Sequence, residues 1–171
     1  MFIEDGDLVL RPVEEEDLKF IRDTRMTPGV REEMGFRKPA NLEQMEEGFT
    51  EAVENDDHIE LLIVYQESRA GHLSVDLDPE NGNADYGMFL HTDFHGEGLG
   101  TRVTELVLEY VFSEFPVNRV DVSYRKGNKA SEKMQRKTGF QEEARERDYI
   151  YLRGEYHDLV RKSLLREEWE K

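Results

Sequence analysis

The sequence predicts an α+β fold in one domain that spans residues 1–171, and three observations indicate it. Three consecutive β-like segments in the middle of the chain are joined by short turns, as in an antiparallel meander. Amphipathic helical patterns precede and follow this meander. The chain contains no repeat, low-complexity tract or linker, and its 171 residues fit one domain with a sizeable core.

The first third of the chain predicts one strand and two helices. The stretch "DLVLRPV" (7–13) alternates apolar and polar residues, as a short strand does. Residues 14–25 have helical spacing with acids in the first turn, and residues 41–53 form a second helix capped by Asn41. Between them, residues 26–40 hold two Pro and two Gly and therefore predict a loop.

The middle of the chain predicts the meander and a long helix. Strands are expected at 59–65, 71–77 and 84–90, because branched and aromatic residues are separated there by turn-forming residues. A glycine-rich stretch follows the third strand. The apolar stripe of a helix then starts at Leu99 and ends before Pro116.

The last third predicts a strand, a helix and a hairpin. Residues 119–124 alternate as a strand, and residues 128–139 form a helix capped by Asn128. A closing hairpin is expected to turn near Arg153 and Gly154. Together these segments make about seven strands and about four helices.

Composition excludes several classes of site. The chain has no cysteine, so it has no disulfide, no thiolate metal site and no cysteine nucleophile. No apolar run is long enough to span a membrane, and the first 20 residues are acidic rather than basic. We therefore expect a soluble, cytoplasmic protein with no membrane partner.

The charge of the chain is strongly negative. Asp and Glu number 39 against 23 Lys and Arg, which gives a net charge of −16. Nucleic acid is not expected as a partner, because its phosphates would be repelled. One hypothesis is adaptation to a salty cytosol, in which carboxylates keep the protein soluble and salt screens their repulsion. The alternative is an ordinary acidic protein.

The stretch "FHGEGLGT" (94–101) places Gly96, Gly98 and Gly100 directly before a helix. A strand, a glycine-rich turn and a helix start form an anion site, because unpaired N–H groups point outward there. The P-loop pattern does not fit, since no Lys precedes Thr101, and the spacing G-x-G-x-G is not the dinucleotide pattern G-x-G-x-x-G. A glycine-rich helix entry without a ligand is the alternative.

The longer stretch "LHTDFHGEGLGT" (90–101) resembles the acyl-CoA motif of the GCN5-related N-acetyltransferases (GNAT superfamily). That motif has the form [Q/R]-x-x-G-x-[G/A], and Gly98 and Gly100 fall on its two small positions. His95 stands where the family usually has Gln or Arg, which is a departure. The main-chain cradle for the CoA pyrophosphate does not depend on that side chain.

Three further stretches extend the resemblance over essentially all 171 residues. Asn128, Ser131, Gly139 and Phe140 match the family's later motif N-x-x-[AS] followed by G-F. The stretch "LVLRPVEEEDL" (8–18) and the end of the chain, with Asp158 and "EEW" (167–169), are similar to the ribosomal-protein N-terminal acetyltransferase (RimJ/RimL-like) branch. The resemblance implies the GNAT fold: a mixed, mostly antiparallel sheet with a split between the strand before the glycine loop and its parallel neighbour.

The function that the resemblance implies is direct transfer of acetyl from acetyl-CoA to a primary amine. The expected acceptor is a protein N-terminal α-amine of the ribosomal-protein type. One alternative is a small amine such as a polyamine, an amino acid or an aminoglycoside. Another is a non-catalytic acyl-CoA-binding module. The expected assembly is a monomer or homodimer.

The resemblance also implies a CoA site built mainly from main-chain groups. In the family, the strand before the glycines binds pantetheine and the thioester oxygen, and the following loop and helix bind the pyrophosphate. The residues at these positions are Met88, Phe89, Leu90, His95, Gly96, Glu97, Gly98, Leu99, Gly100, Thr101, Asn128 and Ser131.

The resemblance also implies catalytic roles. Many relatives protonate the thiolate with a Tyr seven residues after the Asn, where this chain has Gln135. In the ribosomal-protein branch that this chain resembles, a Ser at the position of Ser131 suits this task, so the resemblance implies Ser131 as the general acid; the alternative is an ordinary Ser in the first turn of a helix. Asp85, Glu32 and Glu33 are candidates for the general base, and Glu32 and Glu33 also for acceptor binding, because their loop covers the acceptor site in relatives. The alternative for each of the three is an ordinary solvated surface acid. His91 and His95 lie across a strand-to-turn junction, and no metal is expected.

Overall fold

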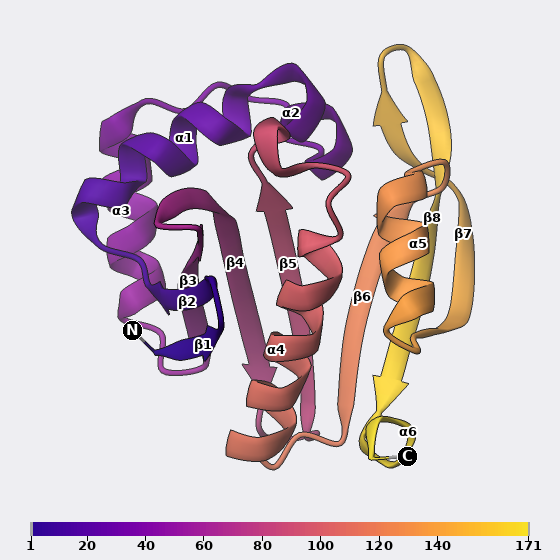
Figure 1. The fold of residues 1–171 in the computed structure, drawn as a ribbon. Coiled ribbons are helices and arrows are strands. Elements are labelled where there is room, and N and C mark those ends of the chain that lie inside the picture. Colours follow the sequence, from indigo (N-terminus) through magenta and orange to yellow (C-terminus); the bar gives the residue numbers. More distant parts are fainter. Residues whose placement is uncertain (1, 171) are drawn as a thin grey trace. The chain divides into compact units, whose positions relative to one another are not determined.

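The structure is a computed structural model that describes residues 2–170, and it has eight strands and six α-helices (Figure 1). The strands are ordered β1-β2-β3-β4-β5-β6-β8-β7. The predicted α+β class with a mixed sheet is confirmed, with one strand and two helices more than expected. The chain is arranged as two compact units, here called unit 1 (residues 1–76 and 87–97) and unit 2 (residues 77–86 and 98–171). A single domain stays a prediction.

Unit 1 contains an antiparallel run of four strands. The registers pair Leu10 with Ile3 on one side and with Ile63 on the other, and Leu61 with Leu73. The third strand is buried on both faces, because three consecutive side chains are at most 2% exposed. The strands are β1 (Ile3–Asp5), β2 (Leu8–Pro12), β3 (His58–Tyr65) and the first part of β4 (Ser68–Asp78).

The helices of unit 1 are α1 (Leu18–Met26), α2 (Pro28–Met34) and α3 (Leu42–Val53). The expected loop over residues 26–40 is wrong, because α2 lies within it. Pro28 begins that helix, and Gly35 ends it with a left-handed φ of 71°. Pro and Gly therefore bound a helix of seven residues instead of preventing one.

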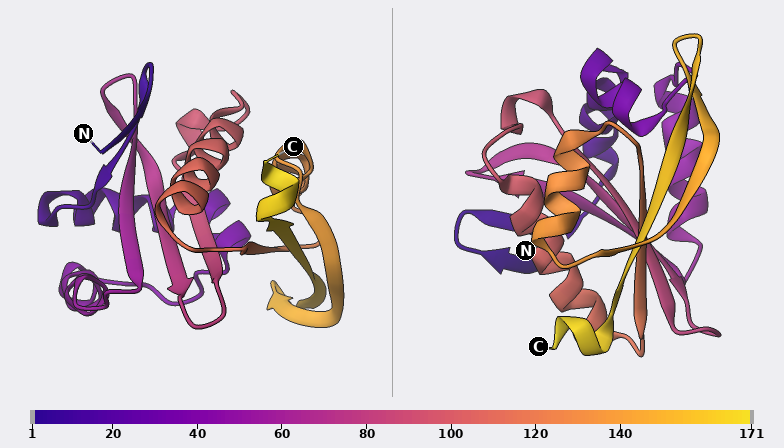
Figure 2. Two further views of the ribbon diagram at one scale, coloured as in Figure 1. Left: turned by 90° about the horizontal axis from the view of Figure 1, so that it is seen from below. Right: turned by 90° about the vertical axis from the view of Figure 1, so that its right-hand side faces the viewer.

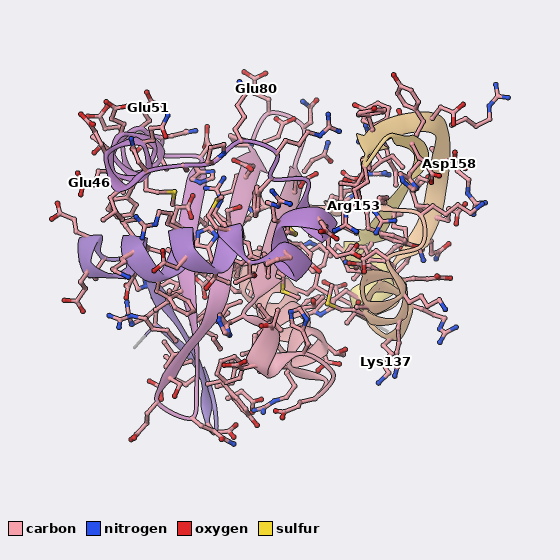
Figure 3. The ribbon with its side chains drawn as sticks, turned by 90° about the horizontal axis from the view of Figure 1, so that it is seen from above. Glu46, Glu51, Glu80, Lys137, Arg153 and Asp158 are labelled. Atoms are coloured by element: carbon pink, nitrogen blue, oxygen red, sulfur yellow. The ribbon has the colours of Figure 1, made fainter. Side chains whose placement is uncertain are left out.

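Helical side chains of unit 1 pack on its strands in an apolar core. The capping of α3 agrees with the prediction, since the Asn41 side chain accepts from the Gln44 N–H at 2.8 Å. Figure 3 shows Glu46 and Glu51 on α3 pointing away from the ribbon, as expected for a chain rich in surface acids. The core side chains include Val13, Leu18, Ile21, Val30, Leu62 and Phe89.

Unit 2 begins at Leu77, at the end of β4, and contains the first part of β5 (Asn83–Leu90) and all later strands. Asn83–Asp85 pair in parallel with Arg119–Asp121, which are the first three residues of each strand. The split that the resemblance implies would follow these pairs. The elements are α4 (Leu99–Glu114), β6 (Arg119–Arg125), α5 (Lys129–Lys137), β7 (Gln141–Leu152), β8 (Glu155–Leu165) and α6 (Arg166–Trp169).

The closing hairpin is confirmed and is longer than expected. Strands β7 and β8 form the twisted ribbon that the right-hand view of Figure 2 shows, and the turn lies between Leu152 and Glu155. The sequence analysis missed α6. Its Arg166 donates to the carbonyls of Phe112, Phe115 and Val117 at 2.6–3.0 Å, so it satisfies the carbonyl end of α4.

Among residues 2–170, no helix is both long and apolar enough to cross a lipid bilayer.

Candidate functional site

The glycine loop owes its glycines to backbone conformation. Gly96 and Gly98 have φ values of 86° and 81°, in the left-handed region that other residues rarely adopt. A Cβ at either position would meet nothing within 4 Å, so lack of space is not the reason for glycine. The left-handed φ therefore explains why positions 96 and 98 are both glycine.

Gly98 is also the N-cap residue of α4. Its carbonyl accepts from the Thr101 N–H at 3.0 Å and from the Arg102 N–H at 3.3 Å. The N–H groups of Leu99 and Gly100 come before the first N–H that bonds within the helix, so they have no acceptor in α4 itself. The first turn of α4 contains no acidic residue. The helix start therefore has the open donors and the dipole that favour an anion such as a pyrophosphate.

A neutral hydrogen-bond chain supports this helix start within unit 2. The Thr104 hydroxyl donates to the Gly100 carbonyl at 2.9 Å, so its oxygen accepts from the Tyr86 hydroxyl at 3.1 Å. Tyr86 in turn accepts from the Gln135 amide at 3.4 Å. Burial raises the pKa of Tyr86, and its proton is already donated to Thr104. Neither Tyr86 nor Gln135 is therefore available to protonate a thiolate.

Asn128 and Ser131 lie together at the start of α5. The Asn128 side-chain oxygen accepts from the Ser131 N–H at 3.0 Å, which agrees with the predicted cap. Ser131 is half-buried in the first turn, and its hydroxyl is not the group that makes this bond. Ser131 thus stays the candidate acid of unit 2.

Asp85 lies on the exposed side of β5. Its registered partner across the parallel pairing is Asp121, and Arg161 of β8 interacts electrostatically with it. A base role for Asp85 stays a prediction.

The last residues of β5 belong to unit 1 and lie against β4. A Cβ at Gly71 would meet the Phe89 carbonyl oxygen at 2.2 Å, so the two backbones approach too closely for any other residue. The His91 N–H then donates to the Ala70 carbonyl at 2.8 Å. Phe89 is buried, and its neighbours Met88 and Leu90 are half-buried.

His95 has a structural partner in unit 1. Its Nε2 lies 2.9 Å from the Leu90 carbonyl oxygen, so this nitrogen carries the proton and donates. The bond closes the short 3₁₀ turn Thr92–Phe94 that follows β5. His95 therefore shapes the entry to the glycine loop, and its contact with phosphate stays a prediction, as does that of Glu97.

Glu32 and Glu33 lie on α2 and not in the loop where they were expected. Within unit 1 the structure brings Met88, Phe89, Leu90 and His95 together. Within unit 2 it brings Gly100 and Gln135 together through Thr104 and Tyr86, and Asn128 with Ser131.

Sequence reasoning missed a polar cluster in unit 1, here called the His58 cluster: His58, Glu60, His72 and Asp76. Nδ1 of His58 lies 2.5 Å from Asp76 Oδ1, and Nε2 lies 2.7 Å from Glu60 Oε1. Glu60 Oε2 is hydrogen-bonded to His72 Nε2. These residues occupy alternate positions of two paired strands, since His58 pairs with Asp76 and Glu60 with Ser74. This alternation is the sequence pattern that could have indicated a shared face.

Hydrogen bonds between opposite charges shift the pKa values of two members of the His58 cluster. Burial alone would lower the pKa of His58, but the bonds to Glu60 and Asp76 outweigh burial and raise it. Burial would likewise raise the pKa of Glu60, and the bonds to His72 and His58 lower it instead. Among residues 2–170, no group of three or more such side chains is arranged to hold a metal ion.

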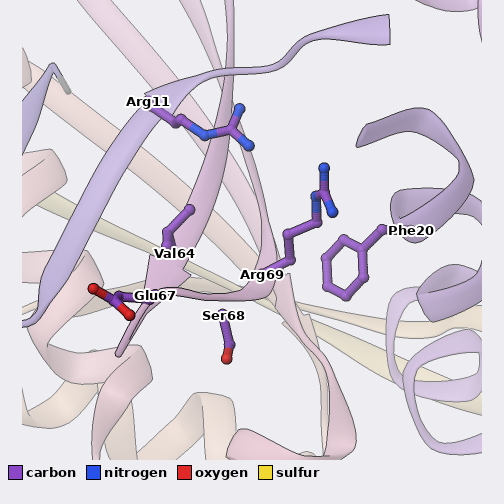
Figure 4. A pocket seen from close by; sticks show the side chains of 6 residues that line it. All are labelled: Arg11, Phe20, Val64, Glu67, Ser68 and Arg69. Carbon is purple, nitrogen blue, oxygen red and sulfur yellow. The ribbon is translucent and has the colours of Figure 1, made fainter. Parts of the chain in front are cut away.

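A second ionic cluster of unit 1 lies beside an open cavity of about 600 Å³, which Figure 4 shows from close by. Asp17 is fully buried and accepts from Arg11 at 2.6 and 2.9 Å and from Arg69 at 2.7 Å. Burial opposes the charge of Asp17, yet these bonds lower its pKa to about 2. Two guanidinium groups on one wall of the cavity are thereby held by a structural carboxylate.

Comparison with known proteins identifies the family. The model of the acetyltransferase (GNAT) domain matches residues 7–141. The chain belongs to this family. The putative ribosomal N-acetyltransferase YdaF of Bacillus subtilis (strain 168) is 37% identical over 113 residues, which are 66% of this chain and 62% of that protein. The aligned part is thus less than two thirds of that relative's length.

Solved structures confirm the GNAT fold. The spermidine N-acetyltransferase from Vibrio cholerae, in complex with CoA and spermine, has a TM-score of 0.90 at 18% identity and covers 98% of this chain and 100% of that one. RimL, a ribosomal L7/L12 α-N-protein acetyltransferase in complex with coenzyme A, has a TM-score of 0.86 at 20% identity, with 94% and 95% covered. The resemblance to GNAT N-acetyltransferases is therefore confirmed, and so is acetyl-CoA as the acetyl donor of this family.

Proposed function

We propose that this GNAT protein transfers acetyl from acetyl-CoA to the α-amine of a protein N-terminus, of the kind that ribosomal proteins present. The observation that carries the donor half of the proposal is the start of α4. It combines a left-handed Gly98, open N–H groups and a first turn without acids in a chain of net charge −16. The acceptor half is supported by the similarity to the putative ribosomal enzyme from Bacillus subtilis.

The chemistry assigns different tasks to the two units. In unit 2, the α4 start would hold the CoA pyrophosphate, and the Ser131 hydroxyl would donate its proton to the departing thiolate. In unit 1, the main chain of Met88–Leu90 would hold pantetheine and polarise the thioester carbonyl. The attacking amine must first lose a proton, because α-amines are largely protonated near neutral pH.

The proposal is tested by measuring thiol release with a thiol-reactive dye. The chain has no cysteine, so every thiol detected comes from CoA. We expect release with peptides that carry a free N-terminus and none with N-acetylated copies of the same peptides. Turnover limited to small amines would contradict the protein-acceptor half.

The acid role of Ser131 is tested by Ser131→Ala, with Ser123→Ala on an exposed position of β6 as the matched control. We expect kcat at saturating acetyl-CoA to fall by more than about tenfold in the first variant, since acid–base groups contribute about 10²–10⁴-fold. The control should keep wild-type turnover. A loss below about threefold would remove Ser131 from the mechanism.

A small cationic amine is the second candidate acceptor. A strongly acidic protein attracts polyamines by electrostatic steering. The spermidine N(1)-acetyltransferase of Escherichia coli (strain K12) is 20% identical over 162 residues. A panel of spermidine, amino acids, aminoglycosides and N-terminal peptides, compared by kcat/KM, ranks the two. Binding of acetyl-CoA by calorimetry without thiol release from any amine would support a non-catalytic module.

We further propose that the protein is cytoplasmic and acts as a monomer or homodimer. Its net charge of −16 supports the separate proposal that it is adapted to a salt-rich environment. In this case the melting temperature should rise from low to molar KCl, because salt screens the repulsion between carboxylates. A melting temperature that does not rise contradicts the salt adaptation.

A further inference from the structure

We propose that His72 takes the proton from the acceptor amine, and that Glu60 and His58 position it for this task. The inference rests on the proposed function and assigns the general base that it lacks. It stands on three observations within unit 1: the bonding of the His58 cluster, the place of His72 beside β5, and the charges that surround the cluster.

The hydrogen-bond geometry fixes the charge of His58. Its two ring nitrogens each face a carboxylate oxygen, at 2.5 Å on Asp76 and 2.7 Å on Glu60. A neutral ring would direct a nitrogen lone pair at one of these anions, so both nitrogens carry protons and His58 is an imidazolium. One oxygen of Glu60 is thereby occupied, and the other is left for His72.

The same carboxylate fixes the tautomer of His72. Because Glu60 is an acceptor, Nε2 of His72 carries a proton and donates it. The lone pair of the neutral ring is then on Nδ1, which is the atom that would accept the proton of the amine. A carboxylate that holds one imidazole nitrogen also stabilises the imidazolium that forms.

His72 lies beside the segment that would bind the thioester. Its ring centroid is 5.4 Å from that of Phe89 on β5, and Phe89 packs edge-on against Phe36 at 5.7 Å. Phe36 follows α2, the helix with the candidate acceptor residues Glu32 and Glu33. The side chain of His72 is 15% exposed, so it is shielded without being sealed from solvent.

Groups of both charge signs surround His72 within unit 1. Glu60 and His58 lie on β3, Asp76 on β4, and Arg25 of α1 interacts electrostatically with Glu60. Two cations, His58 and Arg25, thus share the charge of Glu60. Arg25 also donates to the uncharged sulfur of Met45 on α3 at 3.5 Å.

The protons and bonds of the proposed acetyl transfer balance. R–NH₃⁺ gives one proton to His72 Nδ1, and the free amine forms the new C–N bond with the thioester carbon. The C–S bond breaks as the tetrahedral intermediate collapses, the nitrogen loses its second proton, and the sulfur leaves as CoA–SH after receiving a proton. His72 then returns its proton to water, so one proton is released per acetyl group transferred.

The test compares His72→Gln, Glu60→Gln and the control His157→Gln on β8 by thiol release at saturating acetyl-CoA from pH 6 to 9.5. We expect His72→Gln to lower kcat at least about 100-fold at pH 7, with a loss that shrinks toward the pKa of the amine, where free amine is present without a base. Glu60→Gln should lower kcat about tenfold and move the acidic limb of the profile to lower pH. His157→Gln should stay within about twofold.

Calorimetric binding of CoA reports whether each variant keeps its fold. His72→Ala supplies a second variant, and added imidazole should restore part of its turnover if a proton acceptor is what it lacks. A loss below threefold, or the same loss at every pH with no imidazole rescue, would overturn the role of His72 alone. Absence of thiol release from the unmodified protein would overturn the proposed function and this inference with it.

Discussion

The two units hold their buried polar groups by opposite means. Unit 1 uses ionised groups: Asp17 with two arginines, and the His58 cluster. Unit 2 uses neutral groups to support its helix start, in the chain that runs from Gln135 through Tyr86 and Thr104 to a carbonyl. Changes in pH should therefore act on the acceptor side of the reaction, whereas CoA binding at the start of α4 should depend on backbone geometry.

The largest effect on stability should come from Asp17→Asn in unit 1. Asp17 is 0% exposed, and the substitution removes the negative charge that Arg11 and Arg69 share. Breaking a buried pair costs about 3–5 kcal/mol, so we expect the free energy of unfolding in urea to fall by about 3 kcal/mol. Asp23→Asn is the control, because its pairs with Lys19 and Arg22 are at the surface and worth less than about 1 kcal/mol.

The pH dependence of this pair follows from the lowered pKa of Asp17. Its contribution is present above the unfolded value of 3.8 and is lost as pH falls through about 2. Wild-type protein should therefore lose stability relative to Asp17→Asn between about pH 4 and 2. Two proteins with parallel acid-unfolding curves would show that the Asp17 pair adds nothing.

The next effect concerns the backbone of unit 2. In Gly98→Val, a branched residue must adopt a φ of 81°, so the start of α4 has to rearrange. We expect affinity for CoA to fall at least about 30-fold in calorimetry. Gly154→Val is the matched control, since Gly154 has a similar φ of 89° at the tip of the hairpin. It should lose stability and keep CoA affinity. Equal affinity losses in both variants would mean that strain in general, and not the cradle, weakens binding.

The sequence predicted unit 2 better than unit 1, for a physical reason. The helix cap at Asn128 and the glycine loop are local, so neighbouring residues specify them. The His58 cluster requires the register of β3 and β4, and the Asp17 cluster brings residues 11, 17 and 69 together. Helix α2 was missed because its boundaries are Pro28 and Gly35, residues that also form loops.

A smaller effect is expected from pH on the His58 cluster. The raised pKa of His58 gives stability that is complete below its unfolded value of 6.5 and is lost as pH rises through the folded pKa. The lowered pKa of Glu60 gives stability that is present above 4.5 and is lost at lower pH. Unfolding free energy should therefore be highest between about pH 5 and 6.5 and fall as pH rises above this range. Glu60→Gln should flatten this decline, and an unchanged decline would place its source elsewhere.

The smallest effect should come from Tyr86→Phe in the neutral chain. The variant keeps the aromatic packing and leaves the Gln135 amide, which is 4% exposed, without its hydroxyl partner. An unpaired buried donor costs about 1 kcal/mol, while replacing both partners by apolar groups is nearly neutral. The double variant Tyr86→Phe with Gln135→Leu should therefore recover most of the loss in urea unfolding. Because no ionised group takes part, the CoA affinity of both variants should have the same pH dependence as that of the wild type between pH 6 and 8. Additive losses in the double variant would show that Tyr86 and Gln135 are not coupled, and that the neutral chain does not act as one unit beneath the start of α4.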